Sequence, residues 1–220
     1  MCIRDSVAEA LANTLVIGFI STAVSTILGT TAALALHKYR YKWQGFLNGL
    51  IYLPILIPEI VMGLSLLVLF SQIHLSLGRT SIILAHITFC LSFVVITVGA
   101  RLDGLKQEYE EAAGDLYARP WQCFRYITLP LIMPGITAGA LIAFTLSIDD
   151  FIISFFAAGP NSTTLPLYIY AMVKRGISPE INALSTLMIA AEIALVLLAD
   201  FFQIRQAGTG RKKELPDDRQ

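Results

Sequence analysis

Charge is the property that this sequence has least of. Only 15% of its 220 residues are Asp, Glu, Lys or Arg, whereas an average soluble domain carries roughly 25%. Acidic and basic residues balance at 16 each, so there is no excess of positive charge that would attract nucleic acid. Together with 55% hydrophobic residues, this shortage excludes an ordinary soluble domain and indicates a membrane protein in contact with lipid.

The patterns that carry chemistry are also missing. The three cysteines (Cys2, Cys90 and Cys123) are scattered and odd in number, which fits neither a disulfide framework nor a metal site. The phosphate-binding pattern G-x-x-x-x-G-K-[ST] is absent. No Ser/His/Asp or Cys/His set can be assembled on one accessible face. We therefore expect no catalytic residues, no metal and no cofactor in this chain.

Five intervals are long and apolar enough to cross a bilayer as helices, which need about 20 apolar residues. Helices are the default because backbone groups in lipid must be satisfied within their own segment. The sequence therefore predicts an all-α, polytopic transmembrane bundle with five visible spans. The spans are Leu11–Leu36, Trp43–Phe70, Thr80–Ala100, Tyr126–Ala158 and Ile181–Phe202.

The basic residues predict the orientation of these spans, because cytoplasmic loops carry the excess of Lys and Arg. Twelve bases lie in residues 37–42, 101–129 and the C-terminal segment, and four lie on the opposite side. We expect residues 1–10 to be an outer stub where a fragment begins, residues 101–130 to be a cytoplasmic loop, and residues 205–220 to be a disordered cytoplasmic tail.

The longest polar interval between two apolar runs is Gln107–Pro130, which reads QEYEEAAGDLYARPWQCFRYITLP. Its first part is rich in Glu and Ala, which favour helix. Arg119-Pro120 ends that helix, and Pro120 suits the first position of another. The interval predicts a helix–turn–helix on the cytoplasmic side. It is either an interfacial hairpin that joins two spans or a docking surface for another protein.

The spacing within this interval resembles a family signature. Glu111-Ala112-Ala113, then Ile127 and Leu129-Pro130, resembles the EAA signature of binding-protein-dependent ABC importer permeases. That pattern is E-A-A, three residues, G, nine residues, I, one residue, L-P, and every spacing fits. The glycine position holds Tyr117, which is the one departure. In the family this segment is the coupling helix that lies in a groove of the cytoplasmic ATPase.

The resemblance implies the type I ABC importer permease fold over residues 11–204. Family members have six spans, so we expect the first to be missing here. The implied partners are a second homologous permease, two cytoplasmic ATPase subunits and a periplasmic binding protein, at the bacterial inner membrane. The implied ATPase-coupling residues are Glu110, Glu111, Ala112, Ala113, Asp115, Leu116, Tyr117, Leu129 and Pro130.

Three further segments look like the second permease subunit of spermidine/putrescine importers: residues 86–98 (HITFCLSFVVITV), 143–156 (AFTLSIDDFIISFF) and 165–184 (LPLYIYAMVKRGISPEINAL). This resemblance covers about Leu11 to Phe202. It implies a polyamine permease that forms the translocation path with its partner permease, while another chain hydrolyses ATP.

Three acids inside the spans, Glu59, Asp149 and Asp150, fit a cationic substrate. A carboxylate at mid-membrane costs about 2.5–3.5 kcal/mol on insertion scales, so such residues are rarely incidental. Adjacent helical residues point about 100° apart. We therefore expect one aspartate to line a cavity and the other to pair with a neighbour. These acids belong either to the substrate path or to structural contacts, and we expect His86 to be a hydrogen-bonded packing residue.

Three other functions remain open from the sequence. The first is an ABC permease for another small solute, which the paired aspartates make unfavourable for an anion. The second is an ion-coupled secondary transporter, which predicts an inverted repeat that is not visible here. The third is a membrane enzyme, which needs a facing set of titratable groups.

Overall fold

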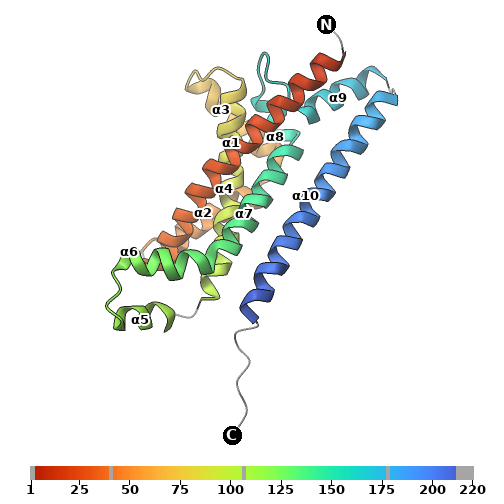
Figure 1. Cartoon of the computed structure of the whole chain (residues 1–220). Helices are drawn as coiled ribbons and strands as arrows, with labels where there is room; N and C mark the ends of the chain where they lie inside the picture. The colour runs from red at the N-terminus through yellow and green to blue at the C-terminus, as the bar shows by residue number, and fades with distance from the viewer. Residues whose placement is uncertain (1–2, 40–41, 106–107, 177–178, 212–220) are drawn as a thin grey trace.

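The computed structural model describes residues 3–39, 42–105, 108–176 and 179–211, and the regular structure of these ranges is helical throughout. Figure 1 shows long helices standing side by side, with short helices at both ends. The helices are α1 (Ile3–Lys38), α2 (Gln44–Leu56), α3 (Glu59–Gln72), α4 (Arg79–Asp103), α5 (Glu108–Asp115), α6 (Pro120–Cys123), the π-helical turn η1 (Phe124–Thr128), α7 (Leu129–Asp149), α8 (Ile152–Ala157), α9 (Leu165–Arg175) and α10 (Pro179–Arg211).

Helices α1, α4 and α7 form the centre of the bundle, and small residues let them approach closely. A Cβ atom on Gly29 of α1 would lie 2.7 Å from Val94 of α4, and one on Gly139 of α7 would lie 3.4 Å from the same residue. Val94 is fully buried between them. Gly135 of α7 likewise faces Arg101 of α4. The Gly135–Gly139 pair therefore serves packing within the chain, as small residues commonly do in membranes.

Three of the helices are long and apolar enough to cross a membrane by themselves, namely Asp5–Lys38, Arg79–Asp103 and Pro120–Asp149. The pair α2 and α3 passes this test only when taken together, and α10 contains a shorter apolar stretch, Ile181–Leu197. The expected fold class is confirmed, because the described residues form an all-helical bundle with apolar spans. The expected number of five straight spans is only approximate.

The expected span Trp43–Phe70 is two helices that meet at an angle of 108°. Pro58 disfavours the helical conformation at the residue before it, and Ile57 is accordingly extended, with φ −77° and ψ 132°. Pro54, in contrast, lies inside α2. Glu59 is therefore the first residue of α3 rather than the middle of a continuous helix.

The expected span Tyr126–Ala158 is also interrupted. Helix α7 ends at Asp149, Asp150 is extended with φ −61° and ψ 121°, and α8 begins at Ile152. The sequence suggested that Asp149 and Asp150 are successive residues of one helix, but Asp150 lies outside α7. Helix α8 packs against α3, where a Cβ atom on Gly63 would come within 2.7 Å of the Phe156 ring.

The two ends of the bundle differ in what they carry. The C-terminal end of α1, the α5–α6 hairpin and the end of α10 lie at one end, whereas the N-terminus and α9 lie at the other (Figure 1). The expected outer stub is helical from Ile3, so residues 3–10 extend the first span. Helix α10 continues to Arg211 through much of the expected tail, and residues 212–220 lie outside the described ranges.

Hydrogen bonds join the loop between α8 and α9 to α1. The Asn13 side chain donates to the Thr163 carbonyl at 3.0 Å, and the Leu165 amide donates to the Thr14 hydroxyl at 2.7 Å. Both α1 side chains are buried. These bonds anchor the start of α9 beside the first turns of α1.

Candidate functional site

The EAA segment forms the hairpin of α5 and α6 at the end of the bundle opposite the N-terminus (Figure 1). The end of α5 is closed by two bonds typical of a helix whose next residue is left-handed. The Ala118 amide donates to the Ala113 carbonyl at 3.0 Å, and the Tyr117 amide donates to the Gly114 carbonyl at 2.9 Å. Tyr117 has φ 58°. The tight turn that the family makes with glycine is thus present here with tyrosine.

The Leu129-Pro130 end of the signature lies where the hairpin joins the long helix α7. Pro130 has no amide hydrogen, and its ring would crowd the carbonyl four residues earlier in a regular helix. The preceding turn, η1, is a π-helix, and the Leu129 amide donates to the Phe124 carbonyl five residues earlier. The wider π turn accommodates the proline without ending the helix.

Large apolar side chains of the hairpin face outward. Tyr117 is 95% exposed and Leu116 is 82% exposed, and Trp121 and Tyr126 are also exposed. An exposed group of large apolar side chains is typical of a surface that binds another protein. Among the described residues of α5 and α6, Ala113 is buried.

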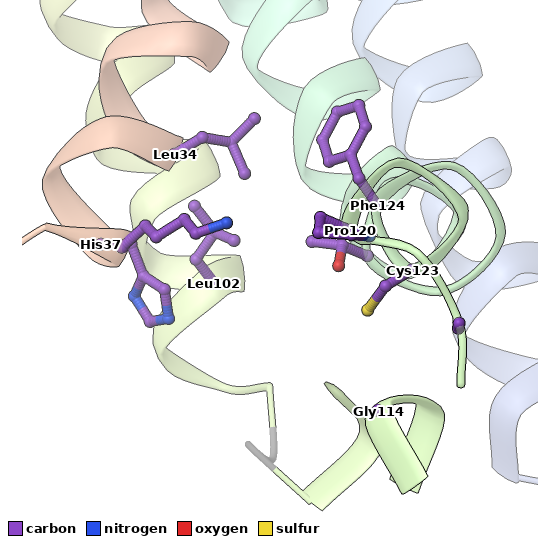
Figure 2. Close-up of a pocket in the computed structure, with 10 residues that line it drawn as sticks. Leu34, His37, Leu102, Gly114, Pro120, Cys123 and Phe124 are labelled. Atoms are coloured by element: carbon purple, nitrogen blue, oxygen red, sulfur yellow. The ribbon is translucent and has the colours of Figure 1, made fainter. Parts of the chain in front are cut away.

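A cavity of about 350 Å³ lies behind the hairpin. Figure 2 shows Leu34, His37 and Leu102, from α1 and α4, opposite Pro120, Cys123 and Phe124, with Gly114 of α5 below. A partly open space therefore separates the hairpin from the ends of α1 and α4.

The remaining predicted coupling residues also have defined places. Glu111, Ala112 and Asp115 lie on α5 with their side chains exposed. The side chain of Glu110 is outside the part that the structure describes. Leu129 is partly buried and Pro130 is exposed at the start of α7.

The three membrane acids gather at the two helix breaks. Glu59 begins α3 and Asp149 ends α7, and both are exposed. The Glu59 carboxylate lies close enough to Asp149 and Asp150 for their charges to act on it. Glu192 of α10, which is half-buried, approaches Asp149. The packing of α3 on α8 is what brings the two breaks together.

Asp150 differs from the other two acids because its side chain is only 4% exposed. Its carboxylate accepts the amide hydrogens of Ile153 and Ser154, at 3.2 and 2.7 Å. It also lies 3.2 Å from Nε2 of His86 on α4. Asp150 therefore pairs with neighbours, whereas Asp149 is exposed, and a break rather than the helical rotation separates the two residues.

His86 is fully buried and hydrogen-bonded, as expected from the sequence. Its Nδ1 lies 2.7 Å from the Ser147 hydroxyl, and its Nε2 lies 3.1 Å from the Ser154 hydroxyl. Neither serine was among the functional residues expected from the sequence. The signal was available, since Ser147, Asp150 and Ser154 are polar residues spaced three and four apart within an apolar run.

These buried residues bring a serine, a histidine and an aspartate together, but not as a nucleophilic site. Ser147 is 4% exposed and His86 is 1% exposed, so no substrate reaches the hydroxyl. Within the described ranges, no group of three His, Cys, Asp or Glu side chains could hold a metal ion.

Comparison with known protein families identifies the family of this chain. The family described as "Binding-protein-dependent transport system inner membrane component" matches residues 13–206, which is most of the chain. The chain belongs to this permease family. Its members are inner-membrane components of ABC importers, which work with a binding protein and ATPase subunits. The permease is thus a transport component, and the resemblance inferred from the EAA spacing is confirmed.

Curated relatives cover most of the permease. The spermidine/putrescine transport system permease protein PotC of Escherichia coli (strain K12) is 43% identical over 194 residues, which is 88% of this chain and 74% of PotC. The putrescine transport system permease protein PotI of the same strain is 41% identical over 194 residues, 85% of this chain and 69% of PotI. A putative 2-aminoethylphosphonate permease, PhnV of Salmonella typhimurium, is 32% identical and covers 86% of the chain and 72% of PhnV.

Solved ABC transporters share the fold. A chain of the inward-facing MetNI methionine transporter superposes with a TM-score of 0.71 at 18% identity, covering 91% of the permease and 94% of that chain. A chain of a bacterial alginate transporter gives 0.69 at 21% identity, covering 90% and 78%. The overall arrangement of the helices is therefore one that these solved ABC importer permeases share.

Proposed function

We propose that the permease carries polyamines inward as one subunit of an ATP-driven importer in the inner membrane. The observation that supports this most strongly is the 43% identity with a spermidine/putrescine permease across 88% of the chain. The chemistry of the spans agrees with it. Residues 43–70, 126–158 and 181–202 contain acids but neither Lys nor Arg, and a polyamine is a multiply charged cation.

Within this proposal, Glu59 and Asp149 line the substrate path, and Asp150 adds its negative charge from behind Asp149. Both exposed carboxylates stand at interruptions of the helices, where transporter sites are commonly built. Membrane carboxylates that face a wet cavity keep their charge at lower cost than those facing lipid. An apolar path with two or three fixed negative charges suits a chain of methylenes between ammonium groups.

Uptake by a reconstituted importer tests the substrate. The permease, its partner permease, the ATPase and the binding protein are placed in vesicles, and uptake of radiolabelled spermidine and putrescine is followed with and without internal ATP. We expect ATP-dependent uptake that 2-aminoethylphosphonate and methionine do not compete away. Uptake that persists without ATP would support an ion-coupled secondary transporter. Competition by 2-aminoethylphosphonate would support an ABC permease for that solute instead of polyamines.

The role of Asp149 is tested by Asp149→Asn, which keeps the shape and removes the charge. We expect spermidine uptake to fall by about tenfold, which corresponds to about 1.4 kcal/mol of lost stabilisation along the path. Asp5→Asn is the matched control, because Asp5 is exposed in the first turns of α1 and far from the breaks. Equal uptake by both variants at equal protein levels would remove Asp149 from the path.

The hairpin is proposed to couple the permease to its ATPase. The exposed Glu111 side chain and the exposed apolar residues beside it present a surface on α5 and α6 that the rest of the chain does not cover. ATP binding would draw this surface and its counterpart on the partner permease together. Because α5 and α6 join α4 and α7 directly in the chain, that movement would reach the spans.

Reversing one charge on this surface tests the coupling. Glu111→Lys is expected to leave membrane insertion intact and to lower uptake relative to ATP hydrolysis by about tenfold, because a desolvated interfacial charge is costly to mispair. Glu108→Lys is the control, since Glu108 is exposed on the same helix but precedes the EAA residues. Normal uptake per ATP by the Glu111 variant would contradict the docking role.

A further inference from the structure

The interruption between α7 and α8 lies in an apolar part of the chain and leaves backbone groups without helical partners. The last carbonyls of α7 and the first amides of α8 are orphaned there. In lipid or in a dry bundle, each unsatisfied group is costly. The structure satisfies two of the amides with one side chain, because the Asp150 carboxylate accepts from Ile153 and Ser154.

The imidazole of His86 spans this interruption from outside. On one side of the break its Nδ1 lies 2.7 Å from the Ser147 hydroxyl. On the other side its Nε2 lies 3.2 Å from the Asp150 carboxylate and 3.1 Å from the Ser154 hydroxyl. With Ser147 donating to Nδ1 and Nε2–H donating to the carboxylate, each atom of the bridge has a partner of the right kind.

The bridge is also tied to the two central helices. His86 belongs to α4, which packs along both α1 and α7. The Ser147 hydroxyl lies 3.5 Å from that of Ser21 on α1. Every side chain of this set is buried, so no water competes for its bonds. A buried network that is fully satisfied holds a single geometry.

We infer that His86 and Asp150 are positioning residues for transport: they hold the α7–α8 break in one shape and so set where the Asp149 carboxylate meets the substrate. This inference rests on the proposed function. Asp149 lies between the two anchors, since Ser147 precedes it by two residues and Asp150 follows it directly. Its own side chain is exposed, so its position depends on the backbone that the anchors fix.

This assignment separates two neighbouring aspartates that look equivalent in the sequence. Asp149 offers its charge to a cation in the path. The Asp150 carboxylate is occupied by two amides and an imidazole, and its side chain is 4% exposed. Asp150 therefore contributes by holding the break and by its field, without touching the substrate.

Two substitutions at position 86 remove the contacts of His86 with Ser147, Asp150 and Ser154 to different extents. His86→Leu removes both sets of bonds while keeping an apolar side chain of moderate size. His86→Gln keeps a donor for Asp150 and shortens the reach to Ser147. Cys90→Ala is the matched control, because Cys90 lies one turn further along α4, is fully buried, and makes a 3.4 Å hydrogen bond to the Ala143 carbonyl of α7.

The first readout is spermidine uptake per assembled importer in the reconstituted vesicles. We expect a loss of about tenfold for His86→Leu and about threefold for His86→Gln, comparable to losing an outer-shell partner of a functional group. Cys90→Ala should stay within about twofold of the parent. If His86 acts through Asp149, adding His86→Leu to Asp149→Asn should cost less than about twofold further, because coupled residues are not additive.

The second readout does not depend on transport. Asp149→Cys is introduced into a chain whose three cysteines are replaced, and the rate of labelling by a membrane-impermeant methanethiosulfonate is measured. We expect His86→Leu to change this rate by about fivefold or more, since the break loses its anchor and samples other shapes. The Gln variant should give a smaller change in the same direction.

The outcomes distinguish the inference from the proposed function. If the parent imports spermidine but His86→Leu lowers only the amount of assembled importer, the positioning role is wrong. It is also wrong if the His86 and Asp149 effects multiply, or if labelling at position 149 is unchanged. If the parent imports no polyamine, the proposed function is wrong, and the labelling rates still decide whether His86 holds the break.

Discussion

At Tyr117 the chain places an aromatic side chain in a left-handed backbone conformation, where glycine has no steric penalty. The side chain is 95% exposed and gains little from the rest of the chain to offset that penalty. The turn persists because the Ala118 and Tyr117 amides are both satisfied by α5 carbonyls. The same exposed ring stands on the surface proposed to bind the ATPase, which is a reason for such a residue to be there.

Replacing this tyrosine should therefore stabilise the turn. Tyr117→Gly is expected to remove about 1 kcal/mol of strain, which slows hydrogen exchange of the α5 amides by about fivefold. Leu116→Gly is the control at the neighbouring exposed position, which is not left-handed, and should speed exchange instead. Faster exchange in the Tyr117 variant would show that the ring stabilises the turn.

At the scale of the helices, the two interruptions act as a pair. Pro58 ends α2, Asp150 separates α7 from α8, and the contact of α3 with α8 brings both breaks together. This contact is close because Gly63 lies directly against the Phe156 ring. The packing of α3 on α8 places Glu59 near Asp149 and Asp150.

A methyl group at Gly63 should loosen this pair of helices. Gly63→Ala places a Cβ atom 2.7 Å from the Phe156 ring, and overpacking of this kind costs about 1–3 kcal/mol. We expect a lower melting temperature of the purified importer and a loss of uptake. Phe156→Leu in the same chain should restore part of both.

The control for this prediction is Gly49→Ala in α2, where a Cβ atom meets nothing within 4 Å. Alanine favours helix over glycine by roughly 1 kcal/mol, so this variant should melt at the same temperature or higher. A Gly63 variant that behaves like the Gly49 variant would contradict the close contact.

At the scale of the whole molecule, the charges and the fold agree on one arrangement. The end of α1, the end of α4 and the hairpin, which carry Lys38, Arg101, Arg119 and Arg125, lie at one end of the bundle, and the N-terminus and α9 lie at the opposite end (Figure 1). We propose that the hairpin and the C-terminus face the cytoplasm, because basic segments are retained there.

Reporter fusions test this orientation. A fluorescent protein joined after Gln220 should fluoresce, and alkaline phosphatase inserted after Asn161, in the loop between α8 and α9, should be active because it folds only outside the cytoplasm. Phosphatase inserted after Leu116, in the turn of the hairpin, is the control and should be inactive. The reverse pattern would overturn the proposed orientation and the docking of the ATPase on α5 and α6.

The sequence alone predicted what depends on local composition and spacing. The lack of charge indicated a membrane bundle, and the order Glu111-Ala112-Ala113 to Pro130 indicated the permease family. Such features depend on a residue and its near neighbours in the chain, so they can be recognised without knowing the tertiary structure. The span Tyr126–Ala158 was nevertheless read as continuous, because an apolar run does not show where a buried side chain takes over the backbone bonds.

Only the tertiary structure distinguished the surroundings of Asp149 from those of Asp150. The difference between them depends on His86, which is more than 60 residues away in the chain and reaches the break from another helix. It also depends on α3 packing on α8, which places Glu59 near the same break. Hydropathy and spacing contain no information on which distant groups will meet. The sequence thus determined that this chain lies in the membrane and to which family it belongs, and the packing decided which acid is held and which is exposed.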